Sequence, residues 1–201
     1  VLHEHLLGLE RLAYALALSK SGSYTRNKRY QSLLDLISRG QNLGAERLGL
    51  GLEASLKQKV LSELRKPFSS SSRLKRPLLY IISELMGDLD HPISYNSLTV
   101  EHVLPQNPTR SSTWMKVFPS ATARRISTHS LGNMVLVSES LNKQLRNQDF
   151  DQKRAQIEKR SAKGKLPAIA QGLVDEQVWD QKAIAQRLDT YVGLLKKAWQ
   201  L

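Results

Sequence analysis

Apolar residues recur at three- and four-residue spacing through the N-terminal half of the chain, and this period limits the possible folds more than any other feature. Such spacing places side chains on one face of a helix. On the first predicted helix that face carries Leu2, Leu6, Leu9, Ala13 and Leu16. The period predicts helices over residues 2–18, 26–39, 52–64 and 77–87. We expect the first helix to bury its apolar stripe and to form a helical hairpin with the second.

The pattern changes in the middle of the chain. Leu98–Val103 is rich in β-branched residues and is soon followed by Pro105, which predicts a short strand. Met134–Val137 predicts a second strand, and Ser138 is suited to cap a helix that follows it. Helical patterns then continue to the C-terminal end. The predicted fold is therefore mainly α, of the α+β class, with a helical scaffold and one small two-stranded element.

The charge of the chain indicates a polyanionic partner. Thirty Lys and Arg against eighteen Asp and Glu give a net charge of +12 and a pI near 10.0. The excess is concentrated in residues 110–165, which hold twelve Lys and Arg against four Asp and Glu. Nucleic acid is the favoured partner, and an anionic membrane surface or a merely solvated surface is the alternative.

The composition excludes several kinds of site. With no cysteine, disulfides and thiolate metal sites are impossible, and the composition suits a reducing cytoplasm. A metal ion would have to be held by His, Asn, Asp or Glu. No apolar run approaches the ~20 residues that a membrane span requires, so we expect no membrane segment.

Glu101 and His102 place a carboxylate and an imidazole side by side at the end of the first predicted strand. Neighbouring strand residues point to opposite faces, so a shared site requires the chain to leave the strand at His102. Pro105 favours that departure. Alone, the pair is a weak signal, because a surface pair or a histidine hydrogen-bonded in the core is the more frequent outcome.

The wider sequence resembles a known family. The resemblance is carried by Glu101-His102-Val103-Leu104-Pro105-Gln106, Leu131-Gly132-Asn133-Met134-Val135-Leu136-Val137, Leu141-Asn142-Lys143, and Phe150 with Lys153-Arg154. These elements, in this order, resemble the C-terminal HNH-like nuclease domain of GmrSD-type modification-dependent restriction enzymes, including SspE-like phage-defence proteins. The resemblance is detailed over about residues 98–160 and implies a ββα-metal (HNH) motif at the small sheet.

The resemblance implies three segments and a set of roles. Residues 1–95 would form the helical scaffold, 96–165 the HNH-like nuclease core, and 166–201 a C-terminal helix packing on the scaffold. His102 would be the general base, and Asn133 would fix the loop and orient His102. Further residues take their expected roles from the same comparison: Glu101 and Asn142 as ligands of Mg²⁺ or Mn²⁺, Lys143, Arg146, Lys153 and Arg154 as DNA contacts, and His129 and Gln106 as accessory groups.

The function expected from these features is a metal-dependent DNA endonuclease, the nicking effector of a phage-defence restriction system in the cytoplasm. We expect a longer protein, whose N-terminal sensor and NTP-hydrolysing domain precedes this chain. The first alternative is a catalytically inactive DNA-binding module of the same fold. The second is a helical partner-docking module, which the many amphipathic patterns would suit.

Overall fold

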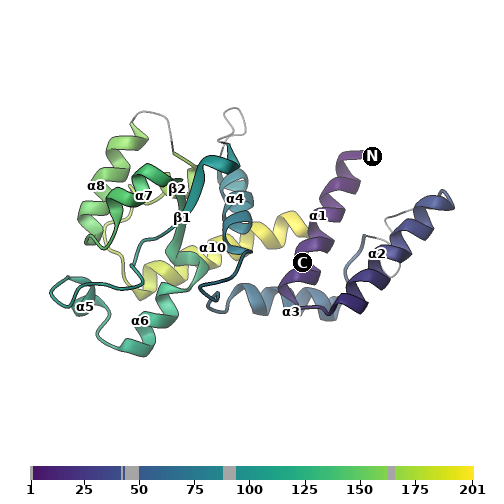
Figure 1. Ribbon diagram of the computed structural model, residues 1–201, viewed down its shortest axis with the longest axis horizontal. Coiled ribbons are helices and arrows are strands. Elements are labelled where there is room, and N and C mark those ends of the chain that lie inside the picture. Colours follow the sequence, from purple (N-terminus) through teal and green to yellow (C-terminus); the bar gives the residue numbers. More distant parts are fainter. Residues whose placement is uncertain (1, 42, 44–49, 88–93, 163–165) are drawn as a thin grey trace. The chain divides into compact units, whose positions relative to one another are not determined.

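The structure is a computed structural model, which describes residues 2–41, 43, 50–87, 94–162 and 166–201 (Figure 1). The chain divides into two compact units, which are described separately. Unit 1 comprises residues 1–65 and 195–201, and unit 2 comprises residues 66–194. These boundaries differ from those of the three segments expected from the sequence, and whether those segments are domains stays a prediction.

Unit 1 is helical. It contains α1 (Leu2–Leu18), α2 (Ser23–Ser38), α3 (Ala54–Leu64) and the last turn of α10 (Gln181–Trp199). α1 packs mainly against α3, so the predicted hairpin of the first two helices is wrong. The indole ring of Trp199 stacks on Tyr14 with 5.2 Å between ring centroids, and its Nε1 donates a hydrogen bond to Glu10 at 3.0 Å.

The predicted apolar stripe of α1 is mostly exposed. Of its five residues only Leu16 is in the core, whereas Leu2 is 73% exposed and Leu6, Leu9 and Ala13 are also exposed. The expectation of a buried stripe is therefore wrong for these four positions. The reason is that spacing identifies the apolar face of a helix, whereas burial depends on which other elements reach that face.

Unit 2 contains the small sheet. Its elements are α4 (Lys75–Met86), η1 (Tyr95–Ser97), β1 (Leu98–His102), α5 (Trp114–Val117), α6 (Ala121–Thr128), η2 (Leu131–Asn133), β2 (Met134–Ser138), α7 (Glu139–Leu145), α8 (Phe150–Ser161), α9 (Ala168–Gln171) and most of α10. Mainly helical with one two-stranded antiparallel sheet, the described chain has the predicted fold class. Among the described residues, no helix combines the length and the apolar character needed to cross a bilayer.

The two strands and the helix after them form a ββα arrangement, which Figure 1 shows beside α8. β1 and β2 pair antiparallel from Leu98 opposite Ser138 to His102 opposite Met134. The apolar run of β2 is fully buried, as expected for a strand with covered faces. α7 then begins at once, because the Ser138 hydroxyl caps it by accepting a hydrogen bond from the Leu141 backbone N–H at 3.3 Å. This places α7 against both strands.

Gly132, just before β2, allows the close approach of α10. A Cβ atom at this position would lie 2.2 Å from the Ile184 carbonyl oxygen and 2.8 Å from the Leu188 backbone nitrogen. Because neither backbone atom can move without shifting the helix, Gly132→Ala should lower the free energy of unfolding by about 3 kcal/mol.

The measurement is the urea midpoint, and Gly193→Ala is the matched control. A Cβ atom at Gly193 meets no atom within 4 Å, and the position lies inside α10. Alanine there should therefore raise stability by about 0.5–1 kcal/mol. Equal midpoints for the two variants would contradict the described packing of Gly132 on α10.

Candidate active site

A polar hollow lies at the end of β1, where the sheet meets α7. Its volume is about 330 Å³. It is lined by Val100, Glu101, His102, Pro105, Gln106, Asn107, Asn142, Arg146 and Asn147. Five predicted site residues, from the strand, the following loop and α7, thus meet in one hollow. The strand ends at His102, which lets Glu101 and His102 share a site although neighbouring strand residues point to opposite faces.

Glu101 is buried and forms an ion pair. Its side chain is 7% exposed, and Oε1 lies 2.6 Å from the ammonium nitrogen of Lys153. Burial raises the pKa of the Glu101 carboxyl group, and the positive charge of Lys153 opposes that rise. Burial also lowers the pKa of Lys153, against the attraction of Glu101. A contact this short between two such groups is a charge-assisted hydrogen bond.

His102 is held as a neutral imidazole. Burial, followed by the positive charges of Lys75, His129 and Lys153, lowers its pKa to about 4. Its Nδ1 lies 3.4 Å from the side-chain amide nitrogen of Gln106, which also lines the hollow. Nδ1 is therefore the ring nitrogen on the side of the hollow. Nε2 is buried, and within the described residues it has no hydrogen-bond partner.

His129 contacts His102 but does not line the hollow. The two rings meet edge to face, with centroids 6.1 Å apart and planes at 82°. The buried Nδ1 of His129 likewise lacks a hydrogen-bond partner among the described residues. Of the two accessory residues expected from the sequence, only Gln106 thus reaches the hollow itself.

Asn142 has a fixed side-chain orientation. Its Nδ2 donates hydrogen bonds to the Thr99 hydroxyl and to the Val100 backbone carbonyl, both at 3.0 Å. A carbonyl oxygen can only accept, so the atom facing Val100 must be the nitrogen. The amide oxygen Oδ1 is therefore the atom that Asn142 has left for a partner in the hollow.

Asn133 makes only part of the contacts expected of it. Its side chain is fully buried, and Nδ2 donates to the carbonyl oxygens of Leu104 and Thr128, both at 3.0 Å. Its Oδ1 accepts from the Leu104 backbone N–H at 2.8 Å and from Trp179 Nε1 at 3.0 Å. Asn133 thus fixes the loop after β1, as predicted. The predicted hydrogen bond to the imidazole of His102 is wrong, because these four contacts use the whole amide.

The four predicted DNA contacts separate into two pairs. Lys143 and Arg146 are exposed, and Arg146 lines the hollow. Lys153 is 1% exposed and bound to Glu101, so the expectation that it contacts DNA is corrected: its ammonium group faces the protein interior. Arg154 is partly exposed, and one of its nitrogens donates to the Glu176 carbonyl oxygen at 3.1 Å.

Two lysines near the site have contacts that the sequence did not predict: Lys75 was not expected at the site, and Lys153 was expected to contact DNA. Lys75 is buried on α4, where its ammonium donates to the Ser70 carbonyl oxygen at 2.8 Å, and its charge lowers the pKa of His102. Lys153 holds Glu101. For Lys153 a signal was present, because Phe150, Lys153 and Ile157 fall on one buried face of α8. For Lys75 the sequence carried no comparable signal.

Carboxylate and amide side chains of the hollow offer oxygens to a metal ion. Among the described residues, no three His, Cys, Asp or Glu side chains gather into a metal-binding group. The two ligands expected from the sequence, Glu101 and Asn142, both line the hollow, together with the amide side chains of Gln106, Asn107 and Asn147. Mg²⁺ fits such a donor set, because it prefers hard oxygen ligands and keeps several of its waters.

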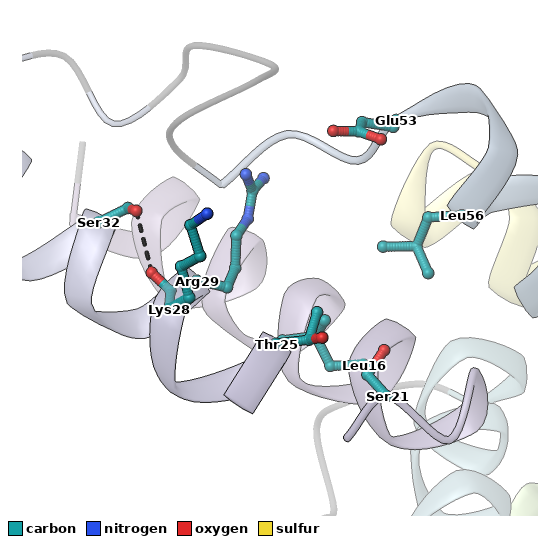
Figure 2. Close-up of a pocket in the computed structure, with 8 residues that line it drawn as sticks. All are labelled: Leu16, Ser21, Thr25, Lys28, Arg29, Ser32, Glu53 and Leu56. Carbon is teal, nitrogen blue, oxygen red and sulfur yellow. Dashed lines mark hydrogen bonds between the residues drawn. The ribbon is translucent and has the colours of Figure 1, made fainter. Parts of the chain in front are cut away.

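A second hollow, of about 390 Å³, lies in unit 1 (Figure 2). It is lined by Leu16, Ser21, Thr25, Lys28, Arg29, Ser32, Glu53 and Leu56. Figure 2 shows Lys28 and Arg29 rising from the helix on one side, with Glu53 and Leu56 on the other. Arg29 is tied to the backbone, since its guanidinium donates to the Gly51 carbonyl oxygen at 2.5 Å. None of the predicted site residues lines this hollow.

A family model matches most of the chain. The model described as "GmrSD restriction endonucleases, C-terminal domain" matches residues 57–194, which include the whole hollow at the end of β1. Among the curated proteins, none matches the chain.

Proposed function

From the premise that this chain belongs to the family of GmrSD restriction endonuclease C-terminal domains, we propose that it is an HNH-type, metal-dependent nuclease that nicks DNA. Membership of this family gives the class of function: a nuclease, which is a hydrolase that acts on DNA. The observation that carries the finer proposal is that Glu101, His102 and Asn142 line one polar hollow. A carboxylate and an amide oxygen can hold a divalent ion, and a neutral imidazole can accept a proton, so together these groups suit metal-assisted hydrolysis.

Glu101 and Asn142 are the proposed ligands of Mg²⁺ or Mn²⁺. The orientation of Asn142 supports this, because its Nδ2 contacts with Thr99 and Val100 leave Oδ1 for an ion. When bound, the ion would supply positive charge to the phosphate and to the leaving oxygen. The protein therefore needs to supply the ligands, the base and the contacts that hold DNA.

His102 is the proposed general base. Its low pKa keeps the imidazole neutral at physiological pH. In the proposed tautomer the proton is on Nε2, so the lone pair is on Nδ1, on the side of the hollow next to Gln106. Nδ1 takes a proton from a water molecule while the water oxygen forms a bond to phosphorus. The bond from phosphorus to the 3′ oxygen breaks, and that oxygen takes a proton from solvent. One such centre cuts one strand, which makes nicking the expected outcome.

Lys143 and Arg146 are the proposed DNA contacts at the hollow. Both are exposed, and Arg146 ends α7 with a φ of 40°, a conformation that favours glycine. A non-glycine residue in this conformation at the rim of a site supports a functional role. Lys143 is paired with Glu139 at 2.6 Å, which leaves Arg146 as the more available cation.

Arg146→Gln should weaken DNA binding at every sequence, because a phosphate contact carries no base information. The slope of log K against log salt concentration should become smaller by about 1, as expected for the loss of one phosphate contact. Fluorescence anisotropy with a labelled duplex at several salt concentrations measures this slope. An unchanged slope would remove Arg146 from the DNA interface.

The alternative is a DNA-binding module of the same fold without activity. The Glu101–Lys153 ion pair favours it, because an ammonium group already neutralises the proposed metal ligand. Both functions predict binding to DNA that weakens with salt. They differ in whether a divalent ion produces strand cleavage.

The deciding experiment is a plasmid assay with the full chain. Supercoiled DNA with Mg²⁺ or Mn²⁺ should yield open circles, and EDTA should prevent this. Binding without any open or linear product, with either ion, would favour the inactive module. Under the proposal, cutting takes place in the cytoplasm, and a sensor and NTP-hydrolysing domain of the same protein selects the target.

A further inference from the structure

We propose that Lys153 is a positioning residue of the active site, which holds one oxygen of Glu101 and leaves the other for the divalent ion. The inference rests on the proposed function, because it concerns the proposed metal ligand. It gives Lys153 a role in geometry in place of the predicted contact with DNA.

Two hydrogen bonds from one ammonium group carry the inference. Lys153 Nζ lies 2.6 Å from Glu101 Oε1 and 3.0 Å from the backbone carbonyl oxygen of His102. Lys153 therefore binds both the side chain of Glu101, the proposed ligand, and the backbone of His102, the proposed base. His102 is the residue at which β1 ends. Since the lysine side chain is 1% exposed, bulk water has little access to replace these contacts.

Lys153 lies on α8, whose start is fixed by the local sequence. Asp149 caps α8, and the Gln152 side-chain oxygen accepts a hydrogen bond from the Asp149 backbone N–H, so the start of the helix is defined. Phe150, Lys153 and Ile157 form its buried face. Burying an ammonium group is costly unless its charge is paired, and replacing a buried pair by apolar residues is often neutral or stabilising. The buried ion pair between Lys153 and Glu101 is therefore better explained by its effect on the Glu101 carboxylate than by a contribution to stability.

The ion pair should affect cation binding and cutting in opposite directions. The charge of Lys153 repels a divalent ion close to Glu101, so its removal should strengthen cation binding. The same removal frees the carboxylate to rotate and loosens the strand end, so cutting should slow. A residue needed only for folding would lose both properties together.

The test compares Mn²⁺ affinity with plasmid nicking in Lys153→Met. Mn²⁺ is titrated by isothermal calorimetry, with no DNA present. We expect the dissociation constant to fall by about tenfold and the nicking rate to fall by about a hundredfold. Lys159→Met, the same change at an exposed site on the same helix, should alter neither. In a Glu101→Gln background, the effect of Lys153→Met on Mn²⁺ affinity should disappear, because Lys153 acts through that carboxylate.

A second variant covers the case in which Lys153→Met fails to fold. Lys153→Gln removes the charge and keeps an N–H donor for Glu101. It should also bind Mn²⁺ more tightly, with a nicking rate between those of the wild type and Lys153→Met.

The outcomes separate this inference from the proposed function. If the wild type binds Mn²⁺ and nicks DNA, but the folded Lys153 variants bind Mn²⁺ equally or more weakly, the positioning role is overturned and the nuclease stands. The same holds if the effect persists in the Glu101→Gln background. If the wild type neither binds Mn²⁺ nor cuts, the proposed function fails and takes this inference with it.

Discussion

His102→Ala is expected to reduce plasmid nicking by about 100- to 10,000-fold, the range that a positioned general base contributes. The imidazole is the titratable group whose pKa, about 4, leaves it neutral and able to accept a proton at physiological pH. Alanine removes the acceptor and leaves Glu101 and Asn142 in place. DNA affinity should therefore stay close to that of the wild type while cutting is lost.

The assay is the rate of open-circle formation, together with duplex binding by anisotropy. His3→Ala is the matched control, because His3 is exposed on α1 and lies outside the hollow. That variant should cut at the wild-type rate. Cutting by His102→Ala at a rate within about threefold of the wild type would contradict its assignment as the base.

Asn133→Ala is expected to give the largest loss of stability, about 3–5 kcal/mol, because it leaves several buried groups without partners. The amide connects the loop after β1 at Leu104 to Thr128 and to the indole of Trp179. Alanine leaves two N–H groups and two carbonyl oxygens to find new partners. A loss of this size is a large part of the stability of an ordinary domain.

Urea unfolding followed by tryptophan fluorescence measures this effect. Asn147→Ala provides the control, since Asn147 is exposed at the hollow and a surface substitution should change stability by less than about 0.5 kcal/mol. A midpoint for Asn133→Ala equal to that of the control would show that the four hydrogen bonds do not hold the loop.

Local patterns predicted the elements that build the site. The β-branched run at Leu98–Val103 and the apolar run at Met134–Val137 gave the two strands, and Ser138 gave the start of α7. These signals lie within a few residues of each other, and backbone preferences act over that range. They placed Glu101 and Asn142 on the elements that the structure brings together.

Contacts between distant segments could not be predicted in the same way. Asn133 accepts a hydrogen bond from Trp179, which lies 46 residues away in the sequence. No local sequence pattern predicts that all the hydrogen bonds of the Asn133 amide are made to other parts of the protein. The exposure of Leu2 and Leu6 has the same origin, because an apolar face becomes buried only where another element covers it.

Lys153 illustrates a different error. The resemblance assigned this residue to the DNA interface, although the helical spacing of Phe150, Lys153 and Ile157 places it on the buried face of α8. Its partner, Glu101, lies 52 residues earlier, so the spacing could have shown that Lys153 is buried but not what it binds.

The most direct measurement of the central claim is a crystal structure of the chain soaked with Mn²⁺, with the ion located by its anomalous scattering. We predict one ion in the hollow, bound by a carboxylate oxygen of Glu101 and Oδ1 of Asn142, on the side that faces Nδ1 of His102. An ion bound only elsewhere, or a hollow without one at Mn²⁺ concentrations that support cutting, would contradict the account.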